Sequence, residues 1–182
     1  MKYARMGDTG LIVSRISFGA MTFTLGNKAM EKIYKVGEDL AKEMGAVAID
    51  KGVNFFDTAD GYAAGESEII LGRALKERRD EVVISTKYGF RAGEALTRAG
   101  LSRQHTMWAA EQCLKRLDTD WIDLFICHKV DRNTPIEETL VALDTLVKQG
   151  KVRYVGFSNW PAWQVAKACE FQRANGLAPF VA

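Results

Sequence analysis

Four side chains with acid–base chemistry come at the ends of short apolar runs in the sequence. Asp57 ends one run and Tyr62 follows five residues later, Lys87 ends the next run, and His128 ends the run after that. A buried ammonium group needs a carboxylate partner, which Asp57 supplies from the neighbouring run. A cation beside a phenol favours the ionised form, so the phenol becomes a usable proton donor near neutrality. Together the four residues predict proton-transfer chemistry.

Each of the four residues also has an ordinary structural explanation when it is taken alone. An aspartate after a strand commonly forms a turn or caps a helix, and a tyrosine in a loop commonly packs with its hydroxyl in water. A lysine at a strand end extends its ammonium to solvent, and a lone histidine is more often structural than catalytic. Only the combination indicates a site.

The apolar runs alternate with longer amphipathic segments, which is the pattern of βα units around a parallel sheet. The runs are almost continuously apolar, as expected for strands that are covered on both faces. A β-hairpin is predicted before them, at Lys2–Val13. The predicted strands are Ile16–Met21, Val53–Thr58, Val82–Lys87, Ile122–His128 and Val152–Phe157, with a further strand starting at Phe180–Ala182.

Capping residues mark several of the predicted helices. The fourth helix is expected to open with Thr134 as its N-cap, Pro135 at its first position and Glu137 three residues beyond the cap. Ser102 is expected to cap the third helix. The first helix is expected at about Lys28–Lys51, where apolar residues recur three and four apart at Ile33, Val36, Leu40, Met44 and Val47.

Five βα units and the start of a sixth fit either an open doubly wound sheet or part of a closed barrel. The sequence contains no Gly-x-Gly-x-x-Gly turn after a strand, which counts against the dinucleotide-binding fold. A (β/α)8 barrel takes roughly 250 residues. We therefore expect residues 1–182 to be one α/β domain, a truncated TIM barrel without its last two or three units. In such barrels the active site lies at the carboxyl ends of the strands, where the four polar side chains are placed.

Composition excludes several other classes of function. The net charge of +2 arises from 25 basic and 23 acidic residues scattered along the chain, which argues against a nucleic-acid partner. No stretch reaches the length of a membrane span and no apolar run begins the chain, so a cytoplasmic protein without a membrane partner is expected. Three widely spaced cysteines, Cys113, Cys127 and Cys169, predict neither a disulfide framework nor a metal site.

Six motifs, in the right order, resemble the aldo/keto reductase family, and the match runs from about Gly7 to the last residue. The resemblance implies a partial (β/α)8 TIM barrel of the aldo/keto reductase type with an N-terminal β-hairpin, and hydride transfer from NADPH to an aldehyde or ketone. The motifs are Asn54–Tyr62, Gly65–Glu68 with Leu71–Leu75, Val82–Lys87, Leu117–Leu124, His128 with Asp131 and Thr134–Thr139, and Gly150–Asn159.

The resemblance also implies a role for each site residue. Tyr62 donates the proton to the carbonyl oxygen, and Lys87, paired with Asp57, promotes the ionisation of the phenol. His128 orients the carbonyl as a neutral imidazole. The implied cofactor-binding residues for NADP(H) are Met21, Thr22, Asp57, Ser158 and Asn159.

Further cofactor contacts of the family come from strand six, strand seven and the segment after strand eight, beyond Ala182. Most of the cofactor affinity is therefore expected to be missing from this chain. A partial barrel also exposes two sheet edges, so we expect a homo-oligomer that pairs these edges.

Two other classes of function remain open. A relative of the potassium-channel beta subunits would share the fold but serve mainly as a binding partner; those proteins lack a histidine at the position of His128, whose presence favours an enzyme. A Schiff-base lyase could use Lys87 as its nucleophile, but the adjacent Asp57 keeps an amine protonated when a nucleophile must be neutral. A catalytically silent half-barrel fragment is a further alternative.

Overall fold

The computed structural model describes residues 1–26 and 35–182. Within these residues a two-stranded antiparallel hairpin precedes a five-stranded parallel sheet. The hairpin consists of β1 (Tyr3–Arg5) and β2 (Ile12–Ser14), and the sheet of β3 (Phe18–Gly19), β4 (Phe55–Asp57), β5 (Val83–Tyr88), β6 (Ile122–Cys127) and β7 (Val152–Phe157). The strands lie in the sheet in chain order. A doubly wound sheet would reverse that order at a switch point, so the fold is α/β and matches part of a TIM barrel wall.

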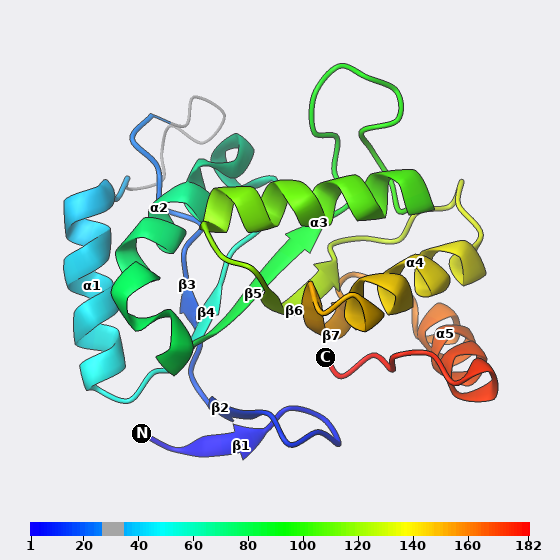
Figure 1. Ribbon diagram of the computed structural model, residues 1–182, viewed down its shortest axis with the longest axis horizontal. Helices are drawn as coiled ribbons and strands as arrows, with labels where there is room; N and C mark the ends of the chain where they lie inside the picture. The colour runs from blue at the N-terminus through cyan, green and yellow to red at the C-terminus, as the bar shows by residue number, and fades with distance from the viewer. Residues whose placement is uncertain (27–34) are drawn as a thin grey trace.

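The helices lie along one side of the sheet and pack against each other in chain order (Figure 1). The hairpin lies near the amino ends of the strands, and the β5–α3 loop projects at their carboxyl ends (Figure 1). The helical elements are α1 (Glu38–Asp50), η2 (Tyr62–Gly65), α2 (Glu66–Leu75), η3 (Lys76–Glu81), α3 (Arg103–Leu117), α4 (Ile136–Lys148) and α5 (Ala162–Asn175).

Alternation along the strands separates the two faces of the sheet. One residue in the middle of each of four strands is completely buried under the helices and forms the centre of the core, namely Phe56, Ile84, Phe125 and Val155. The residues between them, such as Asp57, Ser85 and Lys87, share the opposite face. This alternation places Asp57, Ser85 and Lys87 on the face of the sheet that points away from the helices.

The later strands agree with the sequence prediction better than the earlier ones. β5, β6 and β7 lie within one residue of their predicted bounds, and Val181 N–H donates to the Val155 carbonyl where the next strand was predicted to begin. β3 is only two residues long, because pairing with β4 joins Phe18 to Phe56 and Gly19 to Asp57 alone. β3 and β7 are the outermost named strands, and Phe180–Ala182 pair along the outer side of β7. The pairing of sheet edges with a second copy stays a prediction.

The first helix begins later than its apolar spacing predicted. α1 starts at Glu38, after Gly37 as the N-cap residue. Val36, predicted on the helix, instead forms a parallel bridge with Phe23, and its N–H donates to the Thr22 carbonyl at 2.9 Å. The part of the prediction that covers residues 28–34 lies outside the described residues.

The predicted capping of two helices has opposite outcomes. Ser102 caps α3 as expected, because its side chain accepts a hydrogen bond from the His105 N–H. The capping box predicted for α4 is wrong: the helix begins at Ile136 after Pro135, and the Thr134 hydroxyl donates to Asp131 at 2.7 Å instead. The Thr134 hydroxyl thus bonds to the Asp131 carboxylate and does not cap the helix.

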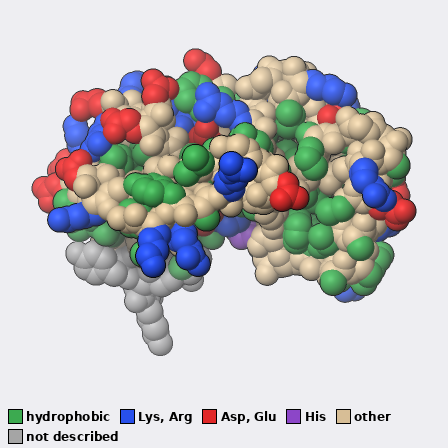
Figure 2. All heavy atoms as spheres, turned by 90° about the horizontal axis from the view of Figure 1, so that it is seen from below, with side chains coloured by type: hydrophobic (Ala, Val, Ile, Leu, Met, Phe, Trp, Pro, Cys, Tyr) green, Lys and Arg blue, Asp and Glu red, His purple; other side chains and the backbone are tan. Residues whose placement is uncertain are grey.

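Charged side chains of both signs are mixed on the face of the molecule in Figure 2, with apolar side chains between them. In the part of the chain that the structure describes, no helix is long and apolar enough to cross a membrane. Cys113 and Cys127 are buried, whereas Cys169 is exposed, contrary to its apolar sequence neighbourhood.

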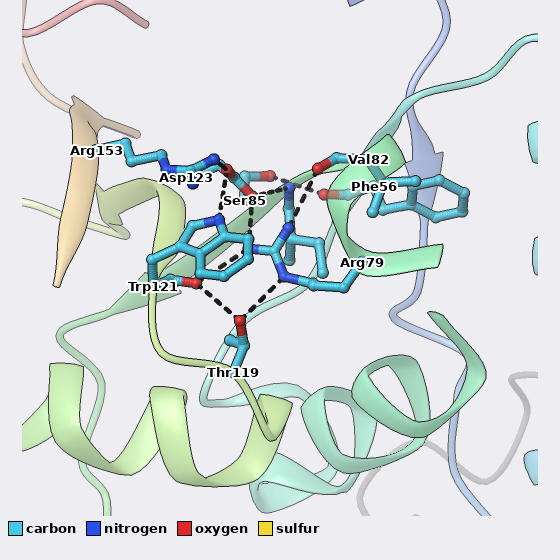
Figure 3. Close-up of polar contacts among 9 residues, drawn as sticks. Phe56, Arg79, Val82, Ser85, Thr119, Trp121, Asp123 and Arg153 are labelled. Carbon is cyan, nitrogen blue, oxygen red and sulfur yellow. Dashed lines mark hydrogen bonds and ion pairs between the residues drawn. The ribbon is translucent and has the colours of Figure 1, made fainter. Parts of the chain in front are cut away.

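The amino ends of β5, β6 and β7 are joined by a buried carboxylate with two arginines (Figure 3). Asp123, whose side chain is 3% exposed, pairs with Arg79 at 2.7 Å and Arg153 at 3.0 Å. It also accepts from the Ile84 N–H and the Trp121 indole. The guanidinium groups of Arg79 and Arg153 lie 4.5 Å and 4.4 Å from the centroid of the Trp121 ring. Both oxygens of this carboxylate are therefore occupied, at the end of the sheet opposite Asp57, Lys87 and His128.

We predict that Asp123→Ala lowers the free energy of unfolding by about 3–5 kcal/mol, because it leaves the Arg79 guanidinium buried without a carboxylate. Chemical denaturation followed by circular dichroism measures the change. Lys42→Ala is the matched control: its exposed pair with Glu77 spans 3.7 Å and contributes far less. Equal denaturation midpoints for the Asp123 variant and the wild type would contradict this role.

Candidate active site

Four predicted catalytic side chains meet at the carboxyl ends of three neighbouring strands. Asp57 is the last residue of β4, Lys87 lies near the end of β5, and His128 follows β6 directly. Tyr62 begins the η2 turn after β4. Because β4, β5 and β6 are adjacent and parallel, their ends open on one space.

The ammonium group of Lys87 is the centre of the site. Its Nζ atom lies 2.6 Å from Asp57 Oδ2 and donates to the Thr58 carbonyl, also at 2.6 Å. The other carboxylate oxygen, Asp57 Oδ1, accepts from the Ser85 hydroxyl at 2.6 Å. The Lys87 side chain is only 10% exposed. The pair therefore fixes the ammonium in position and satisfies both of its charges.

Tyr62 lies against this cation. Lys87 Nζ is 4.9 Å from the centroid of the Tyr62 ring, and the ring meets His128 edge to face at a centroid distance of 5.8 Å. The phenol ring thus lies against both the ammonium and the imidazole. This grouping has the elements that proton transfer to a bound carbonyl requires.

A run of left-handed residues sets the direction of the chain after Tyr62. Ala63 and Ala64 have φ values of 49° and 55°, and Gly65 has 93°. The left-handed region costs a non-glycine residue about 1–2 kcal/mol, so the surrounding structure must hold the two alanines. At Gly65 a Cβ atom would come within 2.6 Å of the Arg116 side chain, which makes glycine necessary there.

His128 is in an environment that keeps its imidazole neutral. Burial, with the nearby Lys87 charge, lowers the pKa of His128 to about 4. Its Nδ1 atom is buried and has no hydrogen-bond partner among the described residues. The Phe90 ring meets the imidazole edge to face at 4.7 Å and is 41% exposed, so it forms an apolar wall beside the site.

The predicted cofactor-binding residues lie on both sides of this group. Asn159 follows β7 and donates from its amide to the His128 carbonyl at 3.0 Å and to the Ser158 hydroxyl at 2.9 Å. Met21, which is 38% exposed, and Thr22 follow β3 at the other side of the site. The structure places all five predicted residues, Asp57 included, at the same end of the sheet.

The loop that carries Met21 and Thr22 is fastened to the first turn of α2. Glu66 accepts from the Thr24 hydroxyl at 2.5 Å and from the Leu25 N–H at 3.1 Å. The Ser67 hydroxyl donates to the Ala20 carbonyl at 2.7 Å. Because α2 begins four residues after Tyr62, these hydrogen bonds join the loop after β3 to the turn that carries Tyr62.

Sequence reasoning missed three contributors to the site. Ser85 lies two residues before Lys87 on the same strand face, and this spacing could have assigned it to the carboxylate. The Thr58 carbonyl and the Phe90 ring had no signal in the sequence, because their contacts depend on loop geometry. In the part of the chain that is described, no group of three or more His, Cys, Asp or Glu side chains is arranged to hold a metal ion.

The sequence matches the model of the aldo/keto reductase family over residues 15–182. The chain belongs to the aldo/keto reductase family. Its sequence is 42% identical over 171 residues to a probable voltage-gated potassium channel subunit beta of Arabidopsis thaliana, and 40% identical over 171 residues to one of Oryza sativa subsp. japonica. Each match covers 92% of this chain and 49% of the relative, so the chain spans about half the length of these relatives.

We predict that the imidazole of His128 stays neutral throughout the physiological pH range and gains a proton only near pH 4. The lowered pKa means that the folded state favours the neutral ring, so acid destabilises the fold as the pH falls below the unfolded value of about 6.5. Imidazole NMR resonances, assigned with His128→Gln, measure the midpoint. A midpoint at or above 6.5 would show that the ring is not shielded as described.

Proposed function

We propose that this member of the aldo/keto reductase family takes part in NADP(H)-dependent reduction of small aldehydes or ketones to alcohols. The observation that supports the proposal most strongly is the buried Lys87–Asp57 pair with Tyr62 packed on the ammonium. A structural ion pair would not need a phenol and a neutral imidazole at the same strand ends. Residues 1–182 would then belong to a single barrel domain.

In this proposal Tyr62 is the proton donor. The Lys87 charge stabilises the phenolate that remains after the phenolic proton passes to the substrate oxygen. Asp57 and the Thr58 carbonyl keep the ammonium beside the ring rather than in solvent. Strain in the turn after Tyr62 restricts the ring to one position, which reduces the loss of entropy in the reacting complex.

His128 and Phe90 would receive the carbonyl compound. A neutral imidazole donates a hydrogen bond to a carbonyl oxygen without competing as a proton donor, and the low pKa of His128 supports this role. The exposed Phe90 ring offers apolar contact to the carbon skeleton of the substrate. The site therefore fits a small carbonyl compound with an apolar portion.

The residues at the rim of the site fit a nicotinamide cofactor. The Ser158 hydroxyl and the exposed Asn159 amide are groups that can pair with a carboxamide, and Thr22 offers a hydroxyl on the opposite side. The cofactor supplies the hydride when it is bound. In the proposal the chain's own residues orient the carboxamide and keep the proton donor beside the substrate.

A second candidate function is binding to a partner protein. It is favoured by the two relatives, which are described as potassium channel beta subunits. We propose a channel protein as the alternative partner. Retention of reductase activity together with the absence of channel binding in a co-purification experiment would reject this alternative, and the opposite pattern would reject the reductase.

We predict that Tyr62→Phe in the complete natural protein lowers kcat for carbonyl reduction by about 10²–10⁴-fold, because only the proton donor is lost. NADPH affinity, measured by fluorescence quenching, should not change. Tyr3→Phe is the control, since it removes a phenol that donates to the Gly52 carbonyl, far from the site. Comparable turnover in the Tyr62 variant would reject its assignment.

Lys87→Met should also lower kcat strongly, because the phenol loses the cation that favours its ionised form. The basic limb of the pH–rate profile should move to higher pH. Lys148→Met, which removes an exposed ammonium that pairs with Asp144 on α4, serves as the matched control. If the Lys87 variant kept the wild-type pH profile, the lysine would have no part in the ionisation.

A further inference from the structure

Two buried carboxylates lie near the Arg116 guanidinium behind the Tyr62 turn, and of the two only Glu68 forms an ion pair with it. Glu68 of α2 is fully buried, and Asp60, two residues before Tyr62, is 8% exposed. Glu68 accepts from Arg116 Nε at 2.6 Å and from the Thr86 hydroxyl at 2.5 Å. Asp60 Oδ1 is buried and has no hydrogen-bond partner among the described residues.

This arrangement leaves the charge of Asp60 uncompensated. Arg116 already forms an ion pair with Glu68, so a single guanidinium is near two carboxylates, those of Glu68 and Asp60. Burial, and then the Glu68 charge, raise the pKa of Asp60 to about 7, against the opposing pull of Arg116, the Gly61 N–H and Lys87. A buried acid with an unsatisfied oxygen is most stable in its protonated form.

The other titratable groups around Asp60 do not supply the missing charge. Burial raises the pKa of Tyr88 from β5 and of Cys113 from α3 well above their usual ranges, so both stay neutral. The Arg91 guanidinium, which donates to the Glu94 and Ala95 carbonyls, lies with Asp60 on the wall of a cavity of about 320 Å³. Asp60, Arg91, Trp108 and Arg116 are among the residues that line it.

Asp60 is connected to the proposed proton donor through a short length of backbone. Its N–H donates to the Lys87 carbonyl at 2.9 Å, and the Tyr62 N–H donates to the Ala59 carbonyl at 3.1 Å. Ala63 and Ala64 then hold their left-handed conformation beside Arg116. A displacement of the Asp60 side chain therefore acts on a turn that is already strained.

We propose that Asp60 is a positioning residue for Tyr62: with its proton it stays buried and keeps the turn as observed, and without its proton it moves toward Arg91 and displaces the Tyr62 ring. The consequence for catalysis rests on the proposed function, in which Tyr62 is the proton donor. The displacement of the Tyr62 ring does not depend on the proposed function. Activity would then fall as the pH rises through neutrality, where His128 is already neutral.

NMR of the ring of Tyr62 and of the Asp60 carboxyl carbon tests the proposal without turnover. In the wild-type chain both signals should titrate together with a midpoint near pH 7. In Asp60→Asn, which imitates the protonated acid, the Tyr62 signal should keep its low-pH position up to pH 8.5. Asp118→Asn is the control, because the pKa of this exposed acid is lowered by Lys76 and the change should leave the Tyr62 midpoint in place.

The pH dependence of the free energy of unfolding provides a second test of the proposal. Between about pH 5 and 7 the folded state holds a proton on Asp60 that the unfolded state has lost, so stability falls as the pH rises. The unfolding constant of the wild type should therefore rise by up to about tenfold per pH unit relative to Asp60→Asn, and level off above pH 7.

The proposal is overturned if the wild-type Asp60 carboxyl titrates below pH 5, or if the Tyr62 signal shifts equally in Asp60→Asn. The carboxyl measurement needs no variant and holds even if Asp60→Asn fails to fold. If the proposed reductase function is wrong, turnover will be absent at every pH while both NMR titrations are still observed. The two failures are thus distinguishable.

Discussion

The pairing of Lys87 with Asp57 is the interaction on which the arrangement of the site depends. An ammonium that is mostly removed from water is stable only beside a carboxylate and further acceptors. The last residue of β4 and the residue after it provide them, as the Asp57 oxygen and the Thr58 carbonyl. This requirement fixes the register of β4 against β5 at the end where the motifs converge. Tyr62 and His128 then lie near an ammonium group whose position is fixed.

Much of the sheet could be predicted from the sequence, because β5 and β6 are buried almost throughout and the strands read as nearly continuous apolar runs. The start of α1 could not, since Val36 satisfies both a helical spacing and a strand bridge. Local chemistry was also ambiguous at Thr134, whose hydroxyl has a stronger acceptor in Asp131 than the helix end.

The candidate site was predicted more completely than the contacts that support it. Asp57, Lys87 and His128 end apolar runs, so strand geometry alone brings them together. The partners of Asp123 and Glu68 come from distant segments, such as Arg153 on β7 and Arg116 on α3. Contacts of this kind join segments that sequence periodicity treats as independent, and only the folded chain reveals them.

The separation between the Asp123 cluster and the Lys87 pair has an evolutionary consequence. The first joins the amino ends of the strands, and the second lies at their carboxyl ends, so a substitution in a loop near Phe90 or Asn159 leaves the arginine–carboxylate network untouched. Selection could therefore change which substrates enter the site, or replace catalysis by binding to another protein, while the sheet and its helices stay the same. Divergence within such a lineage would accumulate in the loops long before it reached the sheet.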